Sequence, residues 1–193
     1  MSMPARGHGL VYVMGASGSG KDTLLRHVAA RLREDDPILI AHRYITRAGS
    51  AHEASLELSR EEFARRVALG CFALHWQGHG LHYGIGIEID AWLEQGRAVV
   101  VNGSRAHLAA AARRYPALCA VEVQVEPGVL ARRLAERGRE SPQEIAERLA
   151  RAGRPYSVPA GLAMVKLDNS GPVEAAAQAL LELARARADA TAR

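Results

Sequence analysis

The sequence predicts a three-layer α/β domain with a mainly parallel central sheet. Three observations support this prediction: short apolar runs alternate with longer helical stretches, glycine, proline or charged residues bound the apolar runs, and proline opens three of the helical stretches. Short apolar runs are typical of strands that are buried on both faces of a parallel sheet. Their alternation with helices indicates a layered α/β architecture.

The predicted strands share a compact, apolar composition. The first reads Leu-Val-Tyr-Val-Met and leads into a glycine-rich turn, the second follows three acidic residues, and the third is rich in valine. The fourth ends before a Glu-Pro pair, and the fifth ends at an aspartate. In chain order, these strands are expected at 10–14, 37–41, 98–102, 120–125 and 164–168.

The predicted helices connect these strands and close the chain. The last three begin at prolines, whose fixed φ suits the first helical turn. In chain order, the helices are expected at 23–33, 59–69, 104–114, 127–136, 142–152 and 172–187.

The length and composition fit one globular domain. A chain of 193 residues is long enough to bury a full core, and its 48% hydrophobic and 24% charged residues exclude disorder over most of the length. There is no internal repeat and no linker. We therefore predict a single domain at 9–188.

The basic residues of the chain are unusually uniform. The net charge is +4, and all but two of the 25 basic residues are arginine; the exceptions are Lys21 and Lys166. Aromatic residues make up only 5%, and no basic run interleaves with them as a groove for single-stranded nucleic acid requires. We expect an anionic small molecule as the partner, and no nucleic acid.

Cysteine usage and hydropathy indicate a cytoplasmic protein. Cys71 and Cys119 form no CxxC pair and no metal-ligand spacing, which favours a reducing compartment. Residues 1–9 lack the apolar stretch of a signal peptide, and no apolar run is long enough to cross a membrane. The sequence leaves monomer and homodimer equally open.

The most specific motif is a glycine-rich loop between the first strand and the first helix. In this context, glycines let backbone N–H groups converge on phosphate oxygens, and the helix N-terminus adds the positive end of its dipole. The lysine places a point charge near the β- and γ-phosphates of ATP. The predicted nucleotide-binding residues are Gly15, Ala16, Ser17, Gly18, Ser19, Gly20, Lys21, Asp22 and Thr23.

One position departs from the usual phosphate-loop pattern. A serine or threonine that ligates Mg²⁺ normally follows the lysine, but here Asp22 follows it and Thr23 comes one residue later. We predict Asp22 as the Mg²⁺ ligand, directly or through water, and Thr23 as a fallback ligand. The alternative is that Asp22 only complements the dipole of the first helical turn.

From about residue 10 to 186, the chain resembles the guanylate kinase branch of the nucleoside monophosphate kinases. It is most similar to a sister family, ribose 1,5-bisphosphate phosphokinase, which makes phosphoribosyl diphosphate during phosphonate breakdown. Four blocks carry the resemblance: the loop with aspartate after the lysine, the Thr-Arg segment in 43–47, the segment 72–84 ending in Tyr-Gly, and the arginine-bearing segment 133–149.

The resemblance implies a P-loop NTPase fold with an acceptor-binding insert at about 42–90 and a small lid at about 133–150. It implies ATP-dependent transfer of a phosphoryl group, with Lys21, Arg137 and Arg148 as catalytic residues. Arg133 and Asn169 are implied at the nucleotide, the latter near the adenine. The acceptor site is implied at Arg43, Arg47, His75, Tyr83, Asn102, Ser104 and Arg105.

Three positions at which the sequence differs from guanylate kinases argue against GMP as the acceptor. His75 replaces a glutamate that accepts hydrogen bonds from guanine, and Asn102 and Ser104 replace an Asp-x-Asp pair. A site that lacks these acceptors loses discrimination for guanine. Fewer carboxylates also reduce repulsion toward ribose 1,5-bisphosphate, which carries phosphate at both ends.

Other interpretations of the same residues stay open at this point. For His75, His79 and His82, a polar acceptor pocket is favoured over a zinc site. The glycines between them argue against one rigid helix that would present all three to a metal. Phe72 and Trp76 are expected to pack. For the whole chain, the alternatives to ribose 1,5-bisphosphate phosphokinase are guanylate kinase or another nucleoside monophosphate kinase, and a non-catalytic guanylate-kinase-like binding module.

Overall fold

The computed structural model describes residues 6–46, 55–78, 80–136, 138 and 141–191. Its central sheet has five strands that are all parallel, which confirms the predicted fold class. In spatial order, they are β2 (Ile38–Ile40), β7 (Ala98–Asn102), β1 (Leu10–Gly15), β8 (Cys119–Gln124) and β9 (Ala163–Asp168). The carboxyl ends of β1 and β7, which are neighbours, lead into the glycine-rich loop and into 103–104 respectively.

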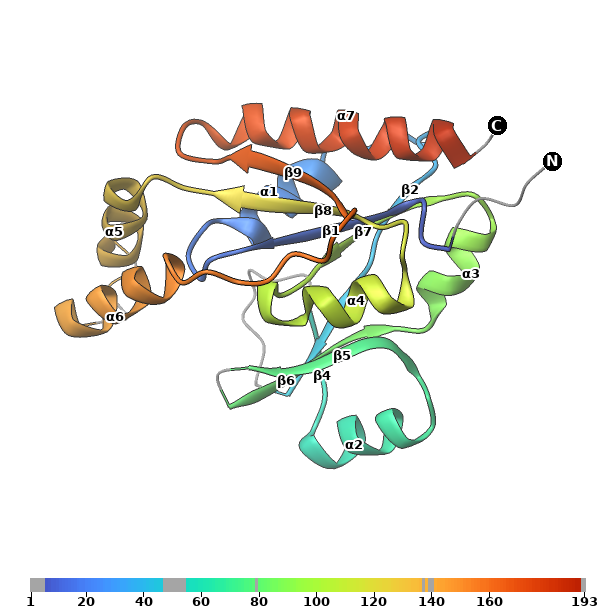
Figure 1. Ribbon diagram of the computed structural model, residues 1–193, viewed down its shortest axis with the longest axis horizontal. Helices are drawn as coiled ribbons and strands as arrows, with labels where there is room; N and C mark the ends of the chain where they lie inside the picture. Colours follow the sequence, from blue (N-terminus) through green and yellow to red (C-terminus); the bar gives the residue numbers. More distant parts are fainter. Residues whose placement is uncertain (1–5, 47–54, 79, 137, 139–140, 192–193) are drawn as a thin grey trace.

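Helices cover both faces of this sheet (Figure 1). One apolar cluster joins it to α1 (Lys21–Ala29) and α7 (Val173–Thr191). A second cluster joins the opposite face to α3 (Glu88–Glu94) and α4 (Leu108–Arg114), the latter preceded by the 3₁₀ turn η1 (Arg105–His107). None of the described helices is both long and apolar enough to span a membrane.

A second, smaller sheet lies beyond α4 at the lower end of the view in Figure 1. Its order is β4 (Ser55–Glu57), β3 (Arg43–Ile45), β6 (Leu81–Gly86) and β5 (Phe72–Gly78), and α2 (Arg60–Ala68) covers one face. The helix was predicted, but the four strands and α3 were not. The strands β3 and β4 are three residues long, which is too short for a periodic pattern to emerge.

Two helices project beside the carboxyl ends of the central strands, at the left of Figure 1. They are α5 (Pro127–Glu136) and α6 (Pro142–Ala152), and their bounds agree with those predicted from the prolines. At the start of α6, Ser141 and Glu144 form a reciprocal capping box. The segment in which we predict a lid is therefore mostly helical in its described part.

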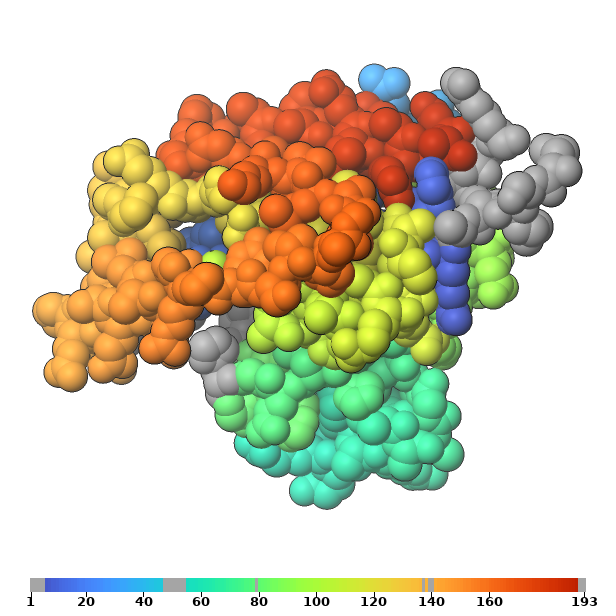
Figure 2. Space-filling model, in the orientation of Figure 1, coloured from blue at the N-terminus to red at the C-terminus, as the bar shows by residue number. Residues whose placement is uncertain are grey.

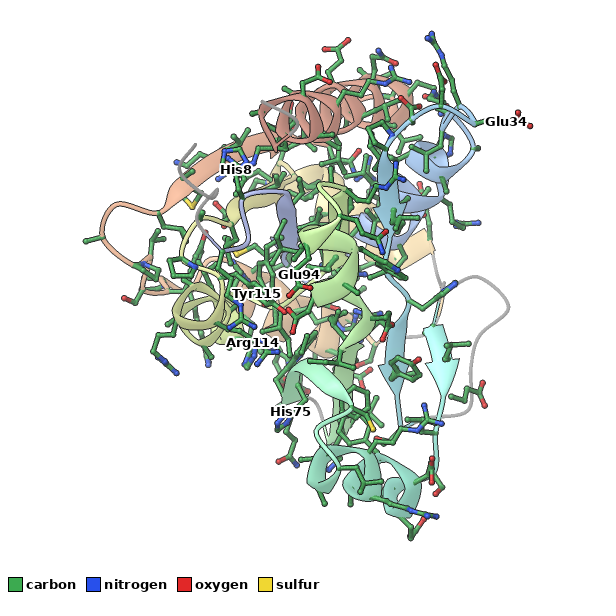
Figure 3. All side chains as sticks on the ribbon, turned by 90° about the vertical axis from the view of Figure 1, so that its right-hand side faces the viewer. His8, Glu34, His75, Glu94, Arg114 and Tyr115 are labelled. Carbon is green, nitrogen blue, oxygen red and sulfur yellow. The ribbon has the colours of Figure 1, made fainter. Side chains whose placement is uncertain are left out.

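A hydrogen-bonded cluster fixes α3 against α4. The Tyr115 hydroxyl donates to Asp90 Oδ1 at 2.6 Å, and Arg114 Nη2 lies 2.7 Å from Asp90 Oδ2. Tyr115 and Arg114 are labelled in Figure 3, beside α3. Burial raises the pKa of Tyr115, so the phenol stays a donor at neutral pH.

The backbone beyond β7 is held by a buried phenol. Tyr12, which is fully buried in β1, donates its hydroxyl to the Ser104 carbonyl at 2.9 Å and accepts from the Ser104 amide at 2.8 Å. Gly103 leaves room for the ring, since a Cβ there would lie 2.1 Å from Tyr12 Cζ. The Tyr12 hydroxyl thus binds both the amide and the carbonyl of Ser104, at the carboxyl end of the central sheet.

We predict that Tyr12→Phe lowers the free energy of unfolding by about 1–3 kcal/mol, because the Ser104 amide loses its acceptor. The Ser104 carbonyl loses one of two donors and keeps the His107 amide at 3.1 Å. Tyr44→Phe is the matched control: no hydroxyl contact of Tyr44 supports the fold in the described residues, so its effect should stay within about 0.5 kcal/mol. Urea unfolding measures both variants. Equal losses in the two variants would contradict the assigned role of the Tyr12 hydroxyl.

Candidate active site

The predicted phosphate-binding loop lies between β1 and α1, where the sequence placed it. Gly18 and Gly20 have φ values of 90° and 84°, which residues with a side chain rarely adopt. A Cβ at Gly20 would approach the Asn169 amide nitrogen to 2.8 Å. Among the described residues, no side chain caps the start of α1. Its first N–H groups therefore remain available to an anion.

Lys21 is folded across this loop. Its Nζ donates to the carbonyls of Gly15 and Ala16, both at 3.0 Å, and lies 3.5 Å from Ser19 Oγ. These contacts hold the ammonium against the loop.

Asn169 supports the loop from the end of β9. Its Nδ2 donates to the Ser19 carbonyl at 2.8 Å, and both residues are buried. We predicted Asn169 near the adenine, and the structure shows in addition that it fixes the loop. No local sequence pattern indicates this contact, because it joins residues 150 positions apart.

Asp22 links three elements. Asn102 Nδ2, at the end of β7, donates to Asp22 Oδ1 at 2.7 Å, and Arg43 Nη2 of β3 lies 3.5 Å from the same oxygen. Asn102 is 5% exposed, and its Oδ1 has no hydrogen-bond partner among the described residues. Three predicted site residues from the nucleotide and acceptor regions thus meet at one carboxylate.

Tyr83 places the Arg43 side chain. The guanidinium carbon lies 5.3 Å from the centre of the Tyr83 ring, a cation–π distance, and Tyr83 stacks on Trp76. Trp76 in turn stacks on His107. Burial is the main cause that lowers the pKa of His107, followed by the charge of His75. A neutral ring therefore ends this stack at neutral pH.

His75 lies on the face of the smaller sheet opposite to Tyr83. It pairs with Gly84, whereas Trp76 pairs with Tyr83, and directly paired residues share a face of a sheet. With Trp76, Gln77 and His82, His75 lines a cavity of about 510 Å³ against α2. Figure 3 shows His75 at the edge of the molecule. Its predicted role at the acceptor stays a prediction that this arrangement does not support.

A zinc site gains no support from the histidines. His79 lies outside the described residues, and the His82 ring packs on Phe63. The described part of the chain holds no group of three or more His, Cys, Asp or Glu side chains that suits a metal. Phe72 stacks on Phe63 as a packing residue, which agrees with the prediction.

The predicted lid arginines approach the loop from α5 and α6. Arg148 Nη1 donates to Ser17 Oγ at 3.1 Å. Arg133 Nη1 lies 3.8 Å from the position that a Cβ of Gly20 would take. Arg137 and Arg47, which we also predicted as site residues, lie outside the described residues.

Arg105 points to the lid and not to the acceptor region. Its Nη1 donates to the Ala152 carbonyl at 2.8 Å, at the end of α6. The predicted role of Ser104 is likewise not visible in its backbone contacts, which go to Tyr12. Of the seven predicted acceptor residues, the structure thus gathers Arg43, Tyr83 and Asn102 beside the loop.

A cavity of about 510 Å³ separates the loop from the two projecting helices. Ala16 and Ser19 line one side, and Leu130 of α5 and Leu149 of α6 line the other. Figure 2 shows the hollow between α5 (yellow) and α6 (orange), with blue atoms of the N-terminal region at its floor. Glu122 of β8 also lines it, a residue that sequence reasoning missed because it lies within an apolar strand.

Comparisons with solved structures define the class. Guanylate kinase from Anaplasma phagocytophilum superposes with a TM-score of 0.68 at 16% identity, over 96% of this chain and 88% of that one. A sugar kinase from Janibacter sp. superposes with a TM-score of 0.51 at 18% identity, over 95% and 98%. At these identities the likeness shows the fold alone. Fold and site together define a P-loop kinase with a guanylate-kinase-like architecture.

Sequence relatives narrow this class to one family. The chain is 61% identical over 186 residues to ribose 1,5-bisphosphate phosphokinase PhnN of Achromobacter xylosoxidans, covering 96% of this chain and 97% of that protein. It is 55% identical over 174 residues to the protein of the same name from Burkholderia mallei, covering 90% and 94%. No protein-family profile matches the sequence. The chain belongs to the ribose 1,5-bisphosphate phosphokinase family, which confirms the resemblance.

We predict that Asn169→Ala weakens ADP binding about tenfold, because the Ser19 carbonyl loses a buried donor worth about 1 kcal/mol or more. Asn169→Asp should bind ADP still more weakly, since a carboxylate would face that carbonyl. Gln178→Ala, on the exposed side of α7, is the control and should leave binding unchanged. Calorimetric titration with ADP gives the three affinities. Wild-type affinity in the Asp variant would refute the assigned contact.

Proposed function

We propose that the enzyme transfers the γ-phosphoryl group of ATP to the C1 phosphate of ribose 1,5-bisphosphate, giving 5-phosphoribosyl 1-diphosphate and ADP. Family membership supports the substrate. The observation that carries the proposal is the position of Arg43, whose guanidinium extends from the smaller sheet to within 3.5 Å of the first turn of α1. A phosphate-binding cation of the acceptor region thereby lies next to the phosphate loop.

The reaction needs no general base. The attacking atom is an oxygen of the C1 phosphate, which is already ionised at neutral pH. It forms a bond to the γ-phosphorus while the bond from that phosphorus to the β,γ-bridging oxygen breaks, and the bridging oxygen leaves with ADP. Catalysis then consists of positioning and electrostatic stabilisation.

This scheme gives a role to the loop and to its neighbouring cations. The loop N–H groups hold the phosphates of the nucleotide, and Lys21 moves from the Gly15 and Ala16 carbonyls to the β- and γ-oxygens. Arg43 holds the acceptor phosphate in line. Arg148, already at Ser17, offsets the charge that spreads over the transferring group. We keep Arg137 as a second lid arginine with the same role.

The oxygen donors beside the loop fit Mg²⁺. The side chain of Asp22 is 39% exposed, and the Oδ1 of Asn102, which has no hydrogen-bond partner in the described part of the chain, belongs to the same cluster. Hard cations prefer such oxygens, and we propose Asp22 as the ligand, Asn102 as a neutral neighbour and Thr23 as a fallback. When bound, the ion neutralises charge on the β- and γ-phosphates. The Asn102 hydrogen bond orients the carboxylate for this purpose.

Substrate choice is the direct test. We predict that ribose 1,5-bisphosphate is phosphorylated at C1, while GMP reacts weakly or not at all. His75, Asn102 and Ser104 stand where guanylate kinases carry a glutamate that accepts from guanine and an Asp-x-Asp pair, of which one acid lies near the metal and one reads the base. The enzyme is incubated with ATP and each acceptor in turn, and phosphorus NMR identifies the product. Turnover of GMP at least as efficient as that of the sugar bisphosphate would make the protein a nucleotide kinase.

A second prediction concerns the metal. Asp22→Ser should raise the Mg²⁺ concentration for half-maximal activity about tenfold or more, because the anionic ligand is lost. Adding Asn102→Asp should restore part of the response, since the carboxylate returns from the facing strand. Magnesium titration of the ADP complex by calorimetry provides a measurement that is independent of turnover.

The control for this pair is Glu61→Ser, which removes an acid from the first turn of α2. If Asp22 only complements a helix dipole, both serine variants will show a modest loss of stability and a normal Mg²⁺ response. That outcome would remove Asp22 from the metal site.

A further inference from the structure

We propose that Arg105 is a positioning residue that holds α6 over the phosphate-binding loop and so keeps Arg148 within reach of the transferring group. The kinetic part of this inference rests on the proposed function, and the conformational part does not. It assigns Arg105 to the lid side of the site, although its sequence context suggested the acceptor side.

The first step is the bond network of Arg105. Its Nη1 donates to the carbonyl of Ala152 at 2.8 Å, and Nη2 lies 3.5 Å from the carbonyl of Arg151. The last carbonyls of a helix have no partner within the helix, and they carry the negative end of its dipole. At the end of α6, the N–H groups of the guanidinium donate to these carbonyls, and its positive charge complements the helix dipole.

The second step is the rigidity of the point from which Arg105 reaches. The residue before it, Ser104, has both backbone polar groups bound by the buried Tyr12 hydroxyl. The Arg105 guanidinium also lies 5.5 Å from the centre of the Tyr156 ring, which packs against the core cluster of the central sheet. Burial raises the pKa of Tyr156 to about 12, so this ring stays neutral at neutral pH. The backbone that precedes Arg105 and its guanidinium are thus both held in place.

The third step is the weak apolar anchoring of α6. Every residue of α6 is described, and none is buried, although the helix packs on α5. Without buried side chains, polar contacts contribute most of what fixes its position. Arg148 and Ala152 are four residues apart and share one face of the helix. The contact at Ala152 therefore sets the helix face from which Arg148 reaches Ser17.

The experiment compares Arg105→Met with Arg105→Lys and with the control Arg113→Met, an exposed arginine of α4. Methionine keeps most of the side-chain length but cannot donate, whereas lysine keeps the charge and can reach one carbonyl. Hydrogen exchange of the amides in 142–152 is measured on the enzyme without substrates. It should rise about tenfold in Arg105→Met, less in Arg105→Lys, and not at all in Arg113→Met.

Steady-state kinetics complete the test. In Arg105→Met we expect kcat to fall about tenfold with the KM for the acceptor unchanged, because Arg148 is presented less often. Unchanged exchange in 142–152, or a raised acceptor KM with kcat kept, would overturn the proposal and return Arg105 to the acceptor site. If Arg105→Met fails to fold, the same comparison is made with Arg105→Lys. Failure of the proposed substrate would leave the exchange result intact, so the two failures are distinguishable.

Discussion

The carboxylate of Asp22 is the contact on which the arrangement of the site depends. An enzyme that joins two phosphorylated substrates must gather cations, and cations at close range repel one another. In this protein, a single oxygen of Asp22 lies near Arg43 of the smaller sheet and accepts from Asn102 of the central one. The negative charge therefore holds Arg43, the cation that we propose for the acceptor, beside the loop. It also joins the two sheets beside the glycine-rich loop.

Around this carboxylate, buried polar side chains fix irregular backbone that regular structure cannot hold. Tyr12 binds the segment after β7, and Asn169 binds the phosphate loop. Each bond spans at least 92 residues of sequence, so the geometry of the site depends on the packing of the entire sheet. Buried hydrogen bonds of this kind are costly to break, because the orphaned group is left without water. The site is thus pre-organised on the carboxyl ends of the parallel strands.

The fold was largely predictable, and its exceptions have physical causes. Buried parallel strands are continuously apolar, and proline marks the starts of α5 and α6, so these elements follow from local chemistry. The smaller sheet has short or partly exposed strands, and between Phe72 and Leu74 a bulge shifts the register of β5. The bulge places His75 on the same face as Phe72, which simple alternation would not predict. The loop and Arg148 were predictable from motifs, whereas the partner of Arg105 was not, since no local pattern encodes a contact 47 residues away.

Arg43 and Arg148 differ in how firmly the surrounding structure holds them. Arg43 lies on a strand, against an aromatic stack that reaches to η1, and 14% of its side chain is exposed. Arg148 lies on a helix that buries no side chain and is tied to the core through carbonyl oxygens. The acceptor role that we propose for Arg43 requires a fixed cation, because a misplaced phosphate loses the in-line geometry. Phosphoryl transfer also requires products to leave, and a helix held by a few polar contacts opens at a lower free-energy cost than one anchored by a core.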